Sequence, residues 1–225
     1  MCAILGFTSP SLKKEQVLPY FEKTKSRGPD DTRLEPAGSG MLGFHRLAIM
    51  GLHPEGMQPF HRGGDMAVCN GELYGFRPVK KALEAKGYVF ASDSDCEIIL
   101  PLWQEYGTEM FAGLDAEFAM IIYDSASDSL VAARDPIGIR PLFYGYLADG
   151  SIIFASEAKN LVGLCTHVFP FPPGHYYKDG KFVRYTDLTT VTRYSSDDLD
   201  TVTKKIREKL ISAVEKRLDA DAPLG

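Results

Sequence analysis

Cys2 is the residue whose position offers the clearest chemistry, because it directly follows Met1. Removal of Met1 would give this cysteine a free α-amine beside its thiol. A thiol titrates near about 8.5 and an α-amine near about 7.7, so the amine can accept the thiol proton directly or through a water. The alternative is a small buried residue that opens the apolar strand Ala3–Phe7, and Cys2 taken alone favours that alternative.

Residues at three further places can have either a structural role or a role in a site. Arg46 lies in the apolar segment Phe44–Ile49, where a buried guanidinium needs a carboxylate or several carbonyl partners, so a structural ion pair and a ligand site both stay open. Asn70 and Gly71 suit a hairpin turn, or an oxyanion hole made of a side-chain amide and a backbone N–H. Asp95 suits a helix cap or a partner for a substrate cation.

The elements that position these residues are expected to be short. In the first half, the patterns predict strands over 3–7, 40–49, 66–69 and 88–91, and helices over 9–24, 76–86 and 97–103. Pro19 and Pro101 are expected to bend or interrupt two of these helices. A polar turn is expected over 70–74.

In the second half of the sequence, apolar residues recur with the period of strands. This pattern predicts one antiparallel sheet from strands over 118–123, 130–133, 142–146 and 152–155, followed by a hairpin that turns at Asp179-Gly180. A long helix over 199–218 follows a polar cap, and its apolar residues recur every three or four positions. Such a stripe requires a partner surface.

Composition limits the class of protein. The 225 residues are 44% hydrophobic, which suits one large domain with or without an appendage, and the net charge of −5 gives no case for nucleic acid. The apolar runs are too short to span a membrane, and no signal peptide is expected. The four cysteines and five histidines show no metal-ligand spacing, so we expect no metal site, no disulfide framework and a cytoplasmic location.

Nine segments, taken in order, are similar to the class II glutamine amidotransferases, which use an N-terminal nucleophile. The chain most resembles the amino-terminal half of glutamine-hydrolysing asparagine synthetases. The segments are Met1-Cys2 with Gly6, Arg27–Asp30, Phe44–Ile49, Gly56–Pro59, Asn70–Tyr74, Asp95–Glu97, Arg134–Phe143, Ala155–Lys159 and Pro173–Tyr176. Each is weak alone, but the ordered set is specific and favours a catalytic Cys2.

The resemblance implies an α+β fold, a four-layer αββα sandwich of two antiparallel sheets. It implies that Cys2 attacks the carboxamide of glutamine and forms a thioester, while Asn70 and Gly71 hold the oxyanion. Ammonia leaves, and water then releases glutamate.

Further residues are implied to bind glutamine. Arg46 matches the partner of the α-carboxylate, and Asp95, with Glu72 nearby, matches the partner of the α-ammonium. Leu47 and Ile49 belong to the same substrate site. No cofactor is expected in this chain.

The resemblance also implies a division at residue 188. Residues 1–188 resemble the glutaminase domain, and residues 189–225 resemble a linker and the first helix of a synthetase domain whose ATP-binding Ser-Gly-Gly-x-Asp-Ser loop is absent here. ATP and magnesium would belong to that domain. The expected partners are glutamine, a synthetase domain or subunit that receives ammonia, and a possible second copy in a homodimer.

Three alternatives stay open. The chain can be the glutaminase domain of another class II enzyme, or a non-catalytic module that binds glutamine or docks to a synthetase if Met1 is retained. A redox thiol protein is least favoured, because Cys2 has no resolving cysteine near it in sequence.

Overall fold

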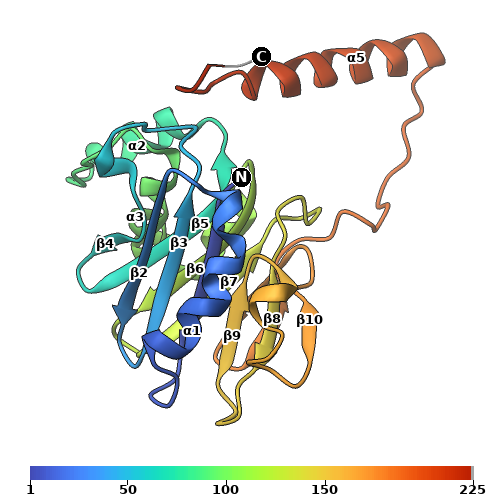
Figure 1. Cartoon of the computed structure of the whole chain (residues 1–225). Coiled ribbons are helices and arrows are strands. Elements are labelled where there is room, and N and C mark those ends of the chain that lie inside the picture. The colour runs from blue at the N-terminus through green and yellow to red at the C-terminus, as the bar shows by residue number, and fades with distance from the viewer. Residues whose placement is uncertain (224–225) are drawn as a thin grey trace.

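Two six-stranded antiparallel sheets stack face to face between helices in this protein, whose computed structural model describes residues 1–223 (Figure 1). The first sheet has the order β10-β8-β9-β1-β3-β2, with strands β1 (Ala3–Thr8), β2 (Asp31–Ala37), β3 (Gly40–Arg46), β8 (Phe143–Tyr146), β9 (Ile152–Ala155) and β10 (Val168–Pro170). The second sheet has the order β12-β11-β7-β6-β5-β4, with strands β4 (Phe60–Arg62), β5 (Asp65–Leu73), β6 (Ala116–Asp124), β7 (Ser129–Arg134), β11 (His175–Lys178) and β12 (Lys181–Arg184).

Helices cover the outer faces of both sheets. The helix α1 (Lys14–Phe21) lies over the first sheet, and a short 3-10 helix over Glu22–Arg27 continues it. The helices α2 (Phe76–Glu84), α3 (Ile99–Tyr106) and α4 (Met110–Gly113) lie over the second sheet, and α5 (Leu199–Lys216) follows the last strand.

Three buried clusters hold these layers together. Val17 and Phe21 of α1 pack on Leu5 and Phe7 of β1. A second cluster fills the space between the sheets, and a third joins the second sheet to α2, α3 and α4. The predicted αββα sandwich is therefore confirmed.

Strand alternation explains why polar residues meet at one end of the space between the sheets. Ile4, Phe44 and Val68 face that space. Cys2, Arg46 and Asn70 each lie two residues along from one of these, so their side chains point to the same side of their sheets. The end of the inter-sheet core is thus polar where the rest is apolar.

The predicted turn over residues 70–74 is wrong, because β5 continues through Leu73. Asn70 to Leu73 pair with Ala119 to Ala116 of β6. Gly71 has no side chain, and a Cβ there would lie 2.5 Å from the carbonyl oxygen of Glu117, so glycine permits a close strand pair where a turn was expected.

Other boundaries also differ from the predictions. The first helix begins at Lys14 instead of Ser9, because the hydroxyls of Ser9 and Ser11 donate to Asp149 across the domain. Residues 88–91 form no strand, and the N–H groups of Ala91 and Ser92 donate instead to the Glu97 carboxylate, at 2.7 and 2.8 Å.

The strands predicted over 118–155 divide between the two sheets instead of forming one. The strand predicted to reach Ile49 ends at Arg46, so Leu47 to Ile49 leave the first sheet. Pro101 lies in the first turn of α3, where its missing N–H is tolerated.

The predicted amphipathic helix is confirmed, and it is α5. The side chain of Asp198 accepts a hydrogen bond from the Thr201 N–H at 2.8 Å and caps its first turn. The helix has no buried residue, and Leu199 and Leu210 of its apolar stripe are 79% and 64% exposed. Leu224 and Gly225, which end the predicted segment 189–225, lie outside the described residues.

Among residues 1–223, no helix is long and apolar enough to cross a bilayer.

Candidate active site

The predicted site residues come together around one small cavity where β1 begins and where β3 and β5 end. Seven of the eight line it, namely Cys2, Arg46, Leu47, Ile49, Gly71, Glu72 and Asp95. Asn70 is the eighth, and it lies directly between the lining residues Cys69 and Gly71. Residues from four separate sequence segments therefore share one site.

The thiol of Cys2 lies at the centre of this arrangement. The pairing of Ala3 with His45, continued by one residue, places Cys2 beside Arg46. Its Sγ is 3.4 Å from the N–H of Leu47, which donates to it, and 3.5 Å from the Leu47 carbonyl oxygen. Burial raises the pKa of the Cys2 thiol, although the Leu47 N–H opposes the rise. The thiol therefore requires a nearby base to become a nucleophile at neutral pH.

Asn70 presents a hydrogen-bond donor with nothing to bind. The residue is 1% exposed, and its Nδ2 has no partner among the residues that the structure describes. An unpaired buried amide costs free energy, so such a donor is characteristic of a site that binds an acceptor from outside. The side chain points to the same inter-sheet space as Cys2.

Arg46 is a buried cation, and two backbone carbonyl groups accept its hydrogen bonds. Its Nη1 donates to the His53 carbonyl oxygen at 3.0 Å, and its Nη2 donates to the carbonyl oxygen of Gly51. Within residues 1–223 it forms no ion pair with a carboxylate, so the structural ion pair considered as an alternative is wrong. A charge that is 6% exposed and lacks a counter-ion can attract an anionic ligand.

Two carboxyl groups line the same cavity. Asp95 begins a 3-10 helix (Asp95–Ile98), and its Oδ2 accepts a hydrogen bond from the Leu73 N–H at 2.7 Å. Burial raises the pKa of Asp95. Burial, together with the charge of Asp95, raises the pKa of Glu72 to about 8. A bound cation would favour the charged form of both groups.

The cavity therefore combines the Cys2 thiol with a guanidinium and two carboxyl groups, and the amide donor of Asn70 lies next to its wall. A free amino acid carries a carboxylate and an ammonium on one carbon, so the guanidinium and the carboxyl groups are complementary to its two charges. The thiol and the amide donor suit attack on a carbonyl group of its side chain.

Comparison with known proteins agrees with this geometry. A family model described as "Glutamine amidotransferase domain" matches residues 1–176. The chain belongs to this family. This amidotransferase domain is 35% identical over 238 residues to a probable glutamine-hydrolysing asparagine synthetase of Dictyostelium discoideum, covering 100% of the chain and 42% of that relative. It is 37% identical over 229 residues to the asparagine synthetase of Sandersonia aurantiaca, covering 99% and 43%. The chain thus spans about two-fifths of the length of these relatives.

A solved structure shares the fold. The glutamine phosphoribosylpyrophosphate amidotransferase of B. subtilis superposes with a TM-score of 0.68 at 20% identity, over 82% of this chain and 49% of that one. The predicted αββα sandwich of two antiparallel sheets is the fold that this likeness supports.

Sequence reasoning assigned no role to several residues that hold the site in place. The Nε of Arg27 donates to the Cys2 carbonyl oxygen at 3.0 Å, and its Nη1 is 2.8 Å from Glu157. The Gln58 amide exchanges two hydrogen bonds with the backbone of Cys69, at 2.6 and 3.2 Å. Arg27, Gln58 and Glu157 all belong to segments that resemble the family. Their presence in those segments was the sequence signal that could have indicated a role at the site.

Replacing Glu72 by glutamine is expected to stabilise the amidotransferase domain above neutral pH. The pKa of Glu72 is about 8 in the folded protein, against a usual value of 4.5, so the folded state binds the proton more tightly. Stability from this group is therefore lost as pH rises from 4.5 through 8. Thermal unfolding should show Glu72→Gln melting about 4 °C above wild type at pH 8.5, with little difference at pH 5.

The matched control is Glu84→Gln, which changes an exposed glutamate at the end of α2. It should follow wild type at both pH values. A Glu72→Gln protein that melts with wild type at pH 8.5 would contradict the assigned environment of Glu72.

Proposed function

We propose that this domain hydrolyses glutamine to glutamate and ammonia through a γ-glutamyl thioester on Cys2. One observation carries the proposal: the Cys2 thiol shares a cavity with two carboxyl groups of raised pKa and with a guanidinium that has no carboxylate partner within residues 1–223. That pattern suits the α-carboxylate and α-ammonium of an amino acid, with the side-chain amide directed at the thiol. Family membership supports the same substrate.

The proposed reaction has two stages. With Met1 removed, the α-amine of Cys2 takes the thiol proton, and Sγ attacks the carboxamide carbon. The Asn70 Nδ2 and the Gly71 N–H stabilise the oxyanion that forms. The C–N bond then breaks, and ammonia leaves with the proton that the amine held. In the second stage water attacks the thioester, the C–S bond breaks, and the thiol regains a proton as glutamate leaves.

Recognition of glutamine is proposed to depend on charge. Arg46 binds the α-carboxylate with two donors, and Asp95 binds the α-ammonium with help from Glu72. Leu47 and Ile49 line the cavity beside them. A simple amide without the two α-charges is therefore expected to be a poor substrate.

Alkylation of the chain by an electrophilic glutamine analogue, mapped by mass spectrometry, tests this proposal. We expect one adduct, on Cys2 of a chain that lacks Met1, and we expect free glutamine to protect it. An adduct at another cysteine, or none, would contradict the proposal. Retention of Met1 would leave an amide in place of the amine and would favour a glutamine-binding module without turnover.

The domain is further proposed to supply ammonia to an asparagine synthetase activity. Two observations support this: the relatives named above are asparagine synthetases that extend well beyond the aligned part, and the apolar stripe of α5 is exposed. On this proposal residues 1–188 are the glutaminase domain, and 189–225 are a linker and the first helix of a synthetase domain that binds ATP and magnesium. A homodimer and a cytoplasmic location stay predictions.

A further inference from the structure

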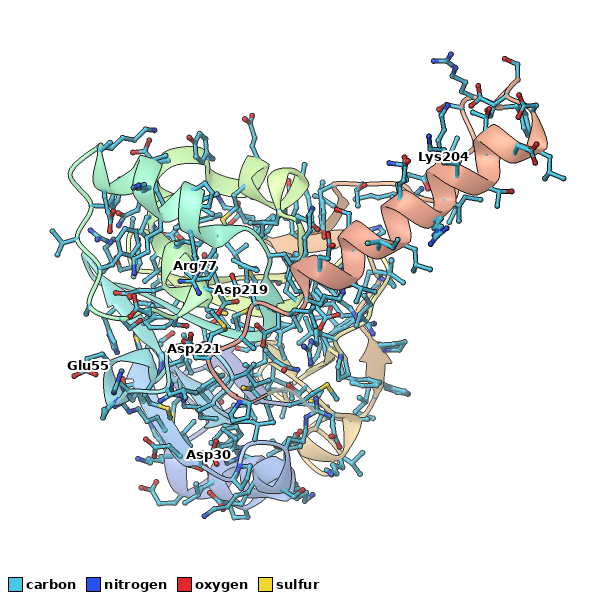
Figure 2. All side chains as sticks on the ribbon, turned by 90° about the horizontal axis from the view of Figure 1, so that it is seen from above. Asp30, Glu55, Arg77, Lys204, Asp219 and Asp221 are labelled. Carbon is cyan, nitrogen blue, oxygen red and sulfur yellow. The ribbon has the colours of Figure 1, made fainter. Side chains whose placement is uncertain are left out.

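The segment that follows α5 returns to the substrate cavity. The N–H groups of Asp221 and Ala222 both donate to the Ile49 carbonyl oxygen, at 3.1 and 3.0 Å. The Gly51 N–H donates to Asp221 Oδ2 at 2.7 Å. In Figure 2 Asp219 lies beside Arg77, and Asp221 lies over the body of the domain. Ile49 lines the cavity, so this segment touches a wall of the site from outside.

Gly51 connects the returning segment to Arg46. Its carbonyl oxygen accepts from the Arg46 Nη2, and its N–H is bound by the carboxylate of Asp221. The residue has a φ of +57°, and a Cβ there would lie 2.7 Å from the Ser94 nitrogen, so this position requires glycine. Because glycine has the freest backbone, a contact at its N–H restricts the conformations available to its carbonyl oxygen.

We infer that Asp221 is a positioning residue for glutamine binding. Its carboxylate holds the backbone around Gly51 so that the Gly51 carbonyl keeps the Arg46 guanidinium aimed into the cavity. The inference rests on the proposed function, since it assigns Arg46 the α-carboxylate of glutamine. Hydrogen bonds to a charged acceptor are stronger than neutral ones, so this contact adds to the hold on the backbone at Gly51.

The effect is partial, because other contacts remain. The Ala48 N–H donates to Asp30 Oδ2 at 2.8 Å and fastens the start of the loop, and the His53 carbonyl still binds Arg46. Loss of Asp221 should therefore weaken glutamine binding without removing it. Chemistry at Cys2 should be unchanged once glutamine is bound.

Asp219 provides a matched control in the same segment. It pairs with Arg77 at 2.9 Å on the surface, where the two side chains are 47% and 52% exposed. It makes no contact with the loop Leu47–Gly51 among the hydrogen bonds of residues 1–223. Exposed ion pairs contribute little, so Asp219→Ala should behave as wild type.

Glutamine hydrolysis by the full chain tests the inference. Asp221→Ala is expected to raise the KM for glutamine about tenfold with kcat within about twofold of wild type. Asp221→Asn keeps a side-chain oxygen that can accept from the Gly51 N–H, so it should recover most of the affinity. Unfolding temperatures should match, because Asp221 belongs to none of the three buried clusters. An unchanged KM in Asp221→Ala, or an equal rise in Asp219→Ala, would overturn the inference.

Calorimetric titration of glutamine into proteins carrying Cys2→Ala separates this inference from the proposed function. A tenfold weaker Kd with Asp221→Ala supports the positioning role even if wild type shows no turnover, in which case only the proposed hydrolysis fails. Normal turnover with Kd and KM unmoved by Asp221→Ala overturns only the positioning role. If the Cys2→Ala protein binds no glutamine and wild type does not turn it over, both fail.

Hydrogen exchange tests the inference without substitution of Asp221. Coupling between two sites is reciprocal, so glutamine should strengthen the contact of the segment with Ile49. In the Cys2→Ala protein, glutamine is expected to slow exchange of the Asp221 and Ala222 amides several-fold. Exchange that is unaffected by saturating glutamine would overturn the coupling.

Discussion

Replacing Cys2 by alanine is expected to abolish glutamine hydrolysis, lowering kcat by at least about a thousandfold. Among the thiols that line this cavity, that of Cys2 is the one whose own α-amine can take its proton once Met1 is removed, and alanine has no thiol. Arg46 and Asp95 remain, so the variant should still bind glutamine. A coupled glutamate assay on purified protein, with calorimetry for binding, measures both results.

Cys165→Ala is the matched control for this prediction. Cys165 is also half-buried and unpaired, but it packs beside the cluster that joins α1 to the first sheet and does not line the cavity. Its replacement should leave kcat and KM as in wild type. Turnover that survives Cys2→Ala would show that another group, or a contaminating enzyme, performs the hydrolysis.

Replacing Asn70 by alanine is expected to lower kcat by about a hundredfold to a thousandfold, which corresponds to roughly 3 kcal/mol. Its Nδ2 is buried without a partner in the described structure, so the free enzyme already bears the cost of an unmade hydrogen bond. That bond forms most strongly with the oxyanion of the intermediate. The KM for glutamine should change little, because the α-charges bind elsewhere. Steady-state kinetics provides the comparison.

Asn70→Asp distinguishes the donor from the shape of the side chain. Aspartate has nearly the same volume but presents oxygen where the amide presents N–H, so it should lose at least as much kcat as alanine does. A rise in KM with kcat unchanged in either variant would instead assign Asn70 to substrate binding. Loss of thermal stability in Asn70→Asp alone is expected, since it buries a charge.

The elements predicted well from the sequence are those that local patterns specify. Residues 152–155 form β9 as predicted, and the hairpin at Asp179-Gly180 joins β11 to β12. The helix α5 keeps its predicted start at Leu199. Alternation, turn residues and a polar cap each act over a few neighbouring residues, so they can be read without knowledge of the fold.

The errors occur where distant contacts override local preference. Asn70 and Gly71 suit a turn, yet pairing with Ala119 and Phe118 of β6, which lie far away in the chain, keeps them in a strand. Residues 88–91 have the composition of a strand, but within residues 1–223 they pair with no strand, and the Ala91 N–H donates to Glu97 instead.

By itself, the sequence determined which groups are available for chemistry and in what order they occur. It also determined which protein family its ordered segments resemble. Only the tertiary structure decided that Cys2, Arg46 and Asn70 face the same end of the space between the sheets, and that Arg46 has carbonyl groups in place of a carboxylate partner. The structure also brought Asp221 into contact with the loop Leu47–Gly51, and no sequence motif indicated this contact. The physical reason is that side-chain type is local, whereas strand register, sheet packing and the return of a distant segment depend on contacts between residues far apart in the chain.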